Sequence, residues 1–276
     1  MNSEIVMKEV KEGLVEAMKK LPIIVDNNCT SDKTILTTNS EIVMKEVNGQ
    51  HFYEHKGEVY PSVTTILSAY PKGAFFYKWM KDKGNTADTI RDKAARRGTH
   101  VHNAIEHLLN GETLHQLNFT EEEWKMLNRF MDFVLSCKSF KMISTEFKVI
   151  NTEVGYAGTV DLYCELNGEK WLIDFKTSKM EYPTHHIQTA AYAKATNLKI
   201  DKMGILILGM GTRKGWKLAE TKDPELEFKK FLATKTLWEF VNPKDKWVEK
   251  KVYPCILEME NNSKEVKDND KNNNRT

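Results

Sequence analysis

The sequence has no hydrophobic run long enough to cross a membrane. Its longest apolar stretch, around Ile205 to Leu208, has the length of a strand, whereas a spanning helix needs about eighteen or more apolar residues. The first twenty residues contain four glutamates and no arginine, which argues against a secretory signal or a mitochondrial transit peptide. We therefore expect a cytoplasmic protein with no membrane partner, located in the host cytoplasm if a phage encodes it.

Cysteine is scarce, and the net charge is small. The four cysteines form no C-x-x-C pair and have no histidine at ligand spacing, which argues against a zinc site or an iron–sulphur cluster. A net charge of +2 over 276 residues does not by itself indicate a nucleic-acid-binding protein, so any basic surface must be local. Hydrophobic content of 40% and charged content of 29% are typical of a globular chain with a sizeable core.

The N-terminal region contains a duplicated nonapeptide. Residues 2–10 and 39–47 are identical, and a repeat seen only twice indicates a local duplication rather than a solenoid. We expect residues 1–47 to be a weakly packed segment whose second copy leads into the fold. Residues 259–276, dominated by Asn, Lys and Asp, are expected to be a disordered tail.

Residues 48–140 have mainly helical patterns and are predicted to form an N-terminal helical subdomain. The predicted elements are a hairpin over 47–60 that turns near Lys56-Gly57, a helix capped by Ser62, a helix from Thr86 to Leu109 ended by Asn110-Gly111, and a helix opened by the capping box Thr120 to Glu123. Residues 141–258 alternate between strand and helix patterns. Strands at 144–150, 158–176, 203–209 and 216–219, with helices at 183–195 and 224–241, predict a mixed α/β sheet flanked by helices.

Asn167-Gly168 predicts the turn of a β-hairpin, because both central positions of such a turn favour residues that tolerate positive φ. Counting back from this turn places Asp161 opposite Asp174, with Lys176 on the same face. Two opposed carboxylates repel, and a divalent cation between them would remove the repulsion. The alternative is a solvated polar face whose charges coincide by chance.

His102 and Glu106 lie four residues apart, on one face of the predicted helix 86–109. A histidine beside an apolar stripe is usually structural, but here the aspartate pair lacks a third ligand. Glu146, in the preceding strand, is either a further acid of the site or an edge-strand charge. Trp79 and Lys78 belong to a cluster of aromatic residues and lysines that could stack bases and hold phosphates, or could be the core stripe of a helix.

Four motifs in order, the first of them with an added glutamate, resemble the PD-(D/E)XK nuclease superfamily in its RecB-like branch. They are Gly98-Thr-x-x-His102 with Glu106, Gly158-x-x-Asp161, Asp174-x-Lys176 and Gln188-x-x-x-Tyr192. Similarity in Ser62-Val-Thr-Thr-Ile-Leu, the Trp79 region and Gly204-Ile-Leu-Ile points to the mitochondrial genome maintenance exonucleases and their phage-encoded relatives. The resemblance covers about residues 48–240. Val160 stands where the family's name has proline, and the iron–sulphur cysteines of some relatives are absent.

The resemblance implies a restriction-endonuclease-like core at 141–258 and a role for each matched residue. His102, Asp161, Asp174 and the Phe175 carbonyl would bind Mg²⁺ or Mn²⁺, and Lys176 would activate water beside the catalytic Asp161 and Asp174. Gln188, Tyr192 and Glu106 would position the substrate, Glu146 and Thr177 are further candidates, and Arg97, Trp79 and Lys78 would contact nucleic acid.

The function implied by this resemblance is that of a monomeric, metal-dependent DNA exonuclease that prefers single-stranded or frayed ends. Two alternatives remain open at this stage. One is a catalytically silent nucleic-acid-binding protein on the same fold, and the other is a structure-specific endonuclease.

Overall fold

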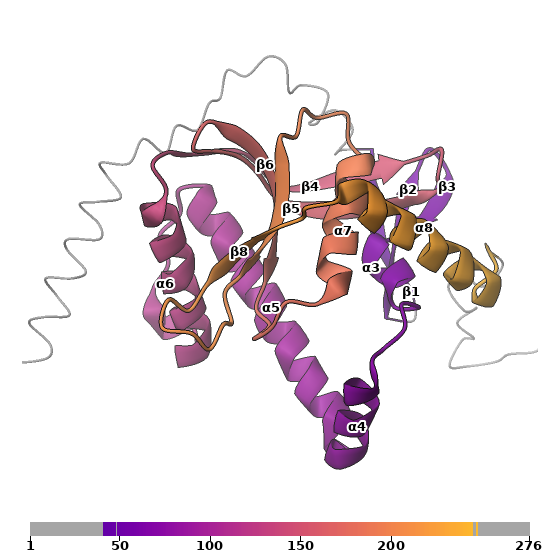
Figure 1. The fold of residues 1–276 in the computed structure, drawn as a ribbon, viewed down its shortest axis with the longest axis horizontal. Coiled ribbons are helices and arrows are strands. Elements are labelled where there is room, and N and C mark those ends of the chain that lie inside the picture. The colour runs from indigo at the N-terminus through magenta and orange to yellow at the C-terminus, as the bar shows by residue number, and fades with distance from the viewer. Residues whose placement is uncertain (1–40, 48, 245–246, 248–276) are drawn as a thin grey trace, which may run out of the picture.

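The computed structural model describes residues 41–47, 49–244 and 247 (Figure 1). The fold is mixed α/β, with a five-stranded sheet and a separate three-stranded sheet. The elements of the first half are β1 (Val43–Val47), β2 (Gln50–His55), β3 (Glu58–Pro61), α3 (Val63–Leu67), α4 (Ala74–Lys83), α5 (Thr86–Leu109), the short 3-10 helix η2 (Gln116–Asn118) and α6 (Glu121–Ser136). Those of the second half are β4 (Phe140–Asn151), β5 (Tyr156–Leu166), β6 (Glu169–Lys176), α7 (Pro183–Lys194), β7 (Lys202–Ile207), β8 (Lys217–Glu220) and α8 (Pro224–Val241).

The large sheet has the strand order β4-β5-β6-β7-β8. Its neighbours are antiparallel except for β6 and β7, which run parallel because α7 connects them as a crossover. This arrangement confirms the predicted mixed sheet flanked by helices.

Two apolar clusters lie on the two faces of the large sheet. One cluster joins α5 and α6 to strand residues that include Leu162, Cys164, Ile173 and Phe175. The other joins α3, α7 and α8 to the opposite face, where Tyr163 and Leu172 are buried. Figure 1 shows α5 and α6 on one side of the sheet and α3, α7 and α8 on the other. Helices therefore cover both faces, and the site residues lie between these layers.

The predicted hairpin is confirmed up to the site. Asn167 and Gly168 have φ values of 54° and 86°, and Leu166 pairs with Glu169. The recorded pairs continue to Leu162–Ile173 and stop before Asp161 and Asp174, so the predicted facing pair is not part of the ladder. Beyond this point β5 continues along β4 and β6 along β7. The two strands therefore separate where the carboxylates are.

The predicted helix ends are confirmed by the cap contacts. The Ser62 hydroxyl accepts a hydrogen bond from the Thr65 backbone N–H at 2.9 Å. The Thr120 hydroxyl accepts one from the Glu123 backbone N–H at 3.3 Å, and the Glu123 carboxylate accepts one from the Thr120 backbone N–H at 2.8 Å. These bonds satisfy backbone groups that a helix terminus otherwise leaves without partners.

The region 48–140 contains more sheet than expected. β1, β2 and β3 form an antiparallel sheet, in which the predicted hairpin turns at Lys56-Gly57. β1 comprises the last five residues of the second copy of the nonapeptide, and Ile42 and Val47 are buried, so this part of the copy packs against the fold through those two side chains. The expectations for residues 1–40 and for the tail 259–276 lie outside the described residues.

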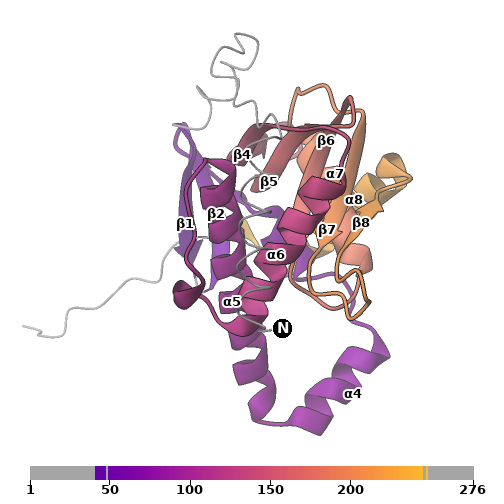
Figure 2. The ribbon, with the colours of Figure 1, turned by 90° about the vertical axis from the view of Figure 1, so that its left-hand side faces the viewer.

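The helix α4 extends away from both sheets. Figures 1 and 2 both show α4 and the first half of α5 projecting from the body of the protein. No residue of α4 is buried. The interpretation of its aromatic residues as a core stripe is therefore wrong. None of the described helices is both long and apolar enough to cross a membrane.

Candidate metal and catalytic site

Four elements bring their polar side chains to the place where β5 and β6 separate. His102 comes from α5, Glu146 from β4, Asp161 from β5, and Asp174 with Lys176 from β6. α7 adds Gln188 and Tyr192 from the opposite layer. Since these elements are far apart in the sequence, only the assembled fold creates the cluster.

Asp161 is the centre of this cluster. Its Oδ2 accepts a hydrogen bond from the Phe175 backbone N–H at 2.6 Å and lies 3.5 Å from His102 Nδ1. The Thr145 hydroxyl donates to the Asp161 carbonyl at 2.7 Å. The Asp161 carboxylate thus takes the position that a neighbouring strand would occupy in a continuous ladder, and it links β5 to β6 beyond the last backbone pair.

Asp174 belongs to a second set of contacts. Its Oδ1 accepts a hydrogen bond from Gln188 Nε2 at 2.9 Å, and the same amide group contacts the Tyr192 hydroxyl at 2.9 Å. Lys176 Nζ lies 2.5 Å from Asp174 Oδ2. That oxygen makes no hydrogen bond of ordinary geometry with any described residue, so the contact is an ion pair. Of the predicted positioning residues, Gln188 therefore contacts a predicted catalytic carboxylate directly, and Tyr192 contacts Gln188.

Glu146 completes a group of three potential metal ligands. One ligand atom each from His102, Glu146 and Asp161 lies within 4.8 Å of the others. Asp174 is not in this group, and the assignments of Asp174 and the Phe175 carbonyl as metal ligands stay predictions. Glu146 has a φ of 47°, which is unusual for a residue with a side chain, and it follows the β-bulge between Met142 and Ser144. Strained backbone of this kind tends to occur at functional sites.

The surroundings of the carboxylates favour the charged form of Asp161 and shift Glu146 and Asp174 toward the neutral form. Burial alone would raise the pKa of Asp161, but the positive charges of His102 and Lys176 and the Phe175 N–H lower it. Burial opposes the charged form of His102, yet the Asp161 carboxylate raises the His102 pKa above its ordinary value. These two residues form a charged pair.

The other two acids are held toward the neutral form. Burial, together with the negative charge of Asp161, raises the pKa of Glu146 to about 8. Burial raises the pKa of Asp174 to about 6, although Lys176 opposes this shift. Removing three acids from water without full compensation is costly, so the cluster favours a bound cation.

Small residues allow the helices to come close to the site. At Gly98, one turn before His102, a Cβ atom would lie 3.5 Å from the Thr177 hydroxyl, so α5 passes directly over the end of β6. At Gly158 a Cβ atom would lie only 2.4 Å from the Tyr192 ring. Close approach thus explains Gly158, whereas Gly98 has room for a Cβ atom at ordinary contact distance.

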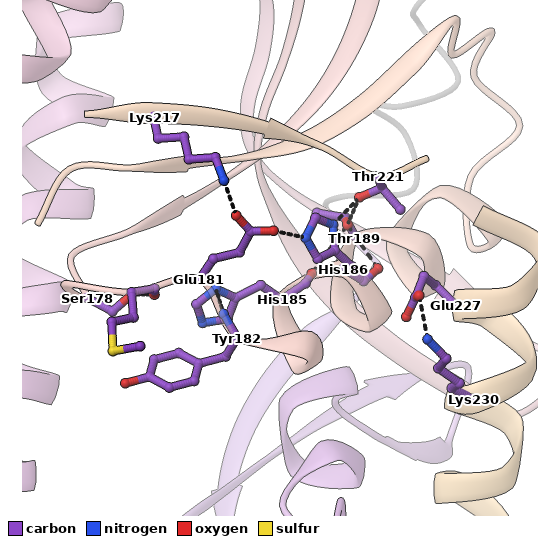
Figure 3. A network of polar contacts seen from close by, with 11 residues as sticks. Ser178, Glu181, Tyr182, His185, His186, Thr189, Lys217, Thr221, Glu227 and Lys230 are labelled. Atoms are coloured by element: carbon purple, nitrogen blue, oxygen red, sulfur yellow. Dashed lines mark hydrogen bonds and ion pairs between the residues drawn. The ribbon is translucent and has the colours of Figure 1, made fainter. Parts of the chain in front are cut away.

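A polar network holds the segment that follows Lys176. Glu181 accepts hydrogen bonds from Lys217 at 2.6 Å and contacts His186 Nε2 at 2.7 Å, as Figure 3 shows. His186 Nδ1 in turn lies 2.9 Å from the Thr221 hydroxyl. The positive partners lower the pKa of Glu181. Since Lys217 is on β8 and His186 is on α7, this network fixes the loop between β6 and α7 from both sides.

The predicted nucleic-acid-binding residues lie apart from the cluster. Trp79 and Lys78 are on α4, and Lys78 is exposed. Arg97 pairs with Glu122 of α6 at 2.8 Å. Glu106 lies one turn after His102, and its negative charge contributes to the raised pKa of Glu146. Thr177 directly follows Lys176 and faces α5 at Gly98.

Two residues near the cluster were not found by the sequence reasoning. The Tyr53 hydroxyl lies 2.9 Å from the Thr159 hydroxyl, and the charges of Glu146 and Asp161 contribute to raising the Tyr53 pKa after the larger effect of burial. His185 is buried, and burial followed by the charge of Lys176 lowers its pKa to about 3. Only the pairing of β2 with the rest of the fold could have indicated Tyr53. His185 could have been suspected from its position three residues before Gln188.

The donor set fits a hard divalent cation. Carboxylate oxygens with one imidazole suit Mg²⁺ or Mn²⁺, whereas thiolate-binding metals prefer cysteine. Of the two cysteines in the described part of the chain, Cys164 is buried in the apolar cluster with α5 and α6, and burial raises its thiol pKa. The predicted choice of metal stays a prediction.

Comparisons with known proteins found no family model that matches this chain, and no curated protein matches it.

Proposed function

We propose that this protein is a metal-dependent nuclease that hydrolyses phosphodiester bonds in DNA, acting from single-stranded or frayed ends. The proposal includes a restriction-endonuclease-like core at residues 141–258, and Mg²⁺ or Mn²⁺ as the cofactor. It goes beyond the coarser finding of a mixed α/β fold with a group of potential metal ligands.

The observation that supports it most strongly is the position of Lys176. A site that only binds a cation gains nothing from an ammonium group, because like charges repel and the metal affinity falls. Here the Lys176 ammonium lies 2.5 Å from Asp174 and shares the cluster with His102 and Asp161. A cation site combined with a lysine suits a reaction in which negative charge accumulates on a phosphoryl oxygen.

Each residue has a role that follows from its contacts. His102, Asp161 and Glu146 would hold the metal, which when bound polarises a phosphoryl oxygen and lowers the pKa of water. Lys176 would stabilise charge on the phosphate and orient the attacking water. Asp174 holds Lys176, Gln188 donates a hydrogen bond to Asp174 at 2.9 Å, and the same Gln188 amide group donates to the Tyr192 hydroxyl at 2.9 Å.

The test is hydrolysis of linear and circular single strands with Mg²⁺ or Mn²⁺. We expect wild-type protein to degrade linear strands, and Asp174→Ala or Lys176→Ala to reduce the rate by at least about 100-fold while DNA binding is retained. Lys170→Ala is the matched control, because Lys170 lies at the other end of β6 and pairs with Glu165 across the ladder.

Three other results would change the conclusion. Cleavage of circular strands would indicate an endonuclease. Binding of DNA without hydrolysis, with both metals and with linear single and double strands, would indicate the catalytically silent binding protein. Wild-type protein that neither binds nor cleaves DNA or RNA would remove the proposal altogether.

A further inference from the structure

Residues 72–96 form a projecting arm, which comprises α4 and the first half of α5 (Figure 2). The only buried residue within this range is Ala87. Phe75 and Tyr77 are 80% and 62% exposed, although aromatic side chains normally contribute to cores or interfaces. The arm therefore presents apolar rings to its surroundings.

The rings of the arm contact one another rather than the body. Phe76 lies 5.7 Å from Tyr77 and 6.3 Å from Trp79, measured between ring centroids. Within the described part of the chain, no ring contact joins these residues to the sheets or to α6. The aromatic cluster is thus part of the arm itself.

The arm is also locally basic. It contains seven lysines and arginines against three aspartates, a net charge of +4, so the rest of the chain carries −2. Arg91 pairs with Asp88, but Lys72, Lys78, Lys81 and Lys83 have no ion pair among the described residues. A polyanion would complement this charge.

The arrangement of residues around α4 suits a nucleic-acid strand. At about 100° per residue, Phe75, Trp79, Phe76, Met80 and Tyr77 span roughly 200° of the helix. Lys83 falls within this arc, and Lys78 and Lys81 flank it. Aromatic rings beside lysines suit bases that stack while the lysines hold phosphates.

α5 connects the arm to the candidate site. Sixteen residues separate Thr86, at the start of α5, from His102, which corresponds to about 24 Å of helix. A nucleic-acid strand with about 3.4 Å per nucleotide would need roughly seven nucleotides to cover this distance.

We propose that the arm is a docking site for single-stranded nucleic acid, separate from the residues around Asp161. Stacking on Phe75, Tyr77 and Trp79 holds the bases, and the unpaired lysines hold the backbone. Binding of a strand by the arm does not rest on the proposed nuclease function. Only a role of the arm in hydrolysis, in which strands long enough to reach from the arm to His102 are favoured as substrates, rests on that function.

The experiment measures binding of fluorescently labelled DNA with a chelator present, so that no hydrolysis occurs. The probes are single strands of about 20 and about five nucleotides, and a duplex of about 20 base pairs. We expect Phe75→Ala/Tyr77→Ala to weaken binding of both single strands at least tenfold, and binding of the duplex less, because the variant removes rings on which unpaired bases stack. The logarithm of the binding affinity falls linearly with the logarithm of the salt concentration. In Lys78→Ala/Lys81→Ala this dependence should be less steep, by about 0.7 for each lysine–phosphate contact that is lost.

Phe240→Ala is the matched control, because Phe240 is an aromatic residue of α8 that is 88% exposed. It should bind the long strand as wild-type protein does. Since no side chain of α4 is buried, the arm variants should also unfold at the wild-type temperature, which excludes a general loss of structure.

Several outcomes would overturn the proposal. These are wild-type affinity of the arm variants for the single strands, or a duplex that depends equally on the arm. Loss of dimerisation in the variants, or wild-type protein that binds anionic phospholipid vesicles but no single strand, would assign the arm to a second copy or to a membrane. Arm-dependent binding by a protein that is inert in hydrolysis would refute the nuclease function alone.

Discussion

Glu146 provides the sharpest test of the candidate metal site. Its pKa is raised to about 8 from an ordinary value of 4.5, first by burial and then by the charge of Asp161. The folded state without metal therefore favours the neutral acid, whereas the unfolded chain ionises it at neutral pH. The stability of the folded state is therefore not reduced by Glu146 below about pH 4.5, where the unfolded chain is protonated too. This stability is lost progressively as the pH rises from 4.5 toward 8.

The magnitude follows from the size of this shift. At pH 7, two and a half pH units above the ordinary value, keeping Glu146 protonated costs on the order of 3 kcal/mol, and at pH 5 about 1 kcal/mol. Glu146→Gln removes this cost while keeping the shape of the side chain. We therefore expect the variant to be more stable than wild-type protein in a chelator, by several degrees in Tm at pH 7 and by less at pH 5.

The assay is thermal or denaturant unfolding at both pH values, with a chelator and then with Mn²⁺. Mn²⁺ should stabilise wild-type protein more than Glu146→Gln, because a ligand that binds only the folded state raises its stability. Glu153→Gln, an exposed acid in the turn after β4, is the control and should behave as wild type. A variant with no gain at pH 7, or with the same gain at pH 5, would refute the reasoning.

Two further predictions concern close packing. At Gly209 a Cβ atom would lie 2.3 Å from the backbone carbonyl oxygens of Thr177 and Ser178. Gly209→Ala should therefore lower the free energy of unfolding by about 1–3 kcal/mol and displace the segment after Lys176. Gly211 has open space around it, so Gly211→Ala should change the free energy of unfolding by less than about 0.5 kcal/mol. Equal unfolding temperatures for the two variants would contradict this. Gly158→Ala should also cost about 1–3 kcal/mol, because its Cβ meets the Tyr192 ring at 2.4 Å, and a double-mutant cycle with Tyr192→Leu should recover part of the loss. Strict additivity in that cycle would show that the ring is not the obstacle.

The sequence was sufficient to predict the elements that depend on neighbouring residues. The turn at Asn167-Gly168, the Ser62 cap and the Thr120 capping box each depend on contacts over a few positions, and the structure has all of them. The register of β5 and β6 followed from the turn, because side chains alternate strictly along a strand.

What could not be predicted depends on tertiary packing. The ladder between β5 and β6 ends before Asp161, although β5 stays paired with β4 and β6 with β7 along their lengths, and no local sequence signal marks this end. The bulge in β4 and the positive φ of Glu146 have no local sequence signal, since glutamate rarely adopts that conformation. The aromatic pattern of α4 fits either a core stripe or an exposed binding surface, and the sequence does not show which. The structure distinguishes them, because no residue of α4 is buried.

The separation of the strands and the state of the acids have one physical cause. A regular ladder would place Asp161 and Asp174 side by side, and their repulsion would destabilise it. In the structure, Asp161 instead accepts the Phe175 N–H and faces His102, while Asp174 faces Lys176 and Gln188. Asp161 and Asp174 thus each have a positive partner, and Glu146, which makes no ion pair with a described residue and is only partly compensated by the charge of His102, carries the strongly raised pKa. A divalent cation beside Glu146 would replace its proton, so metal binding at neutral pH should release protons and depend on pH.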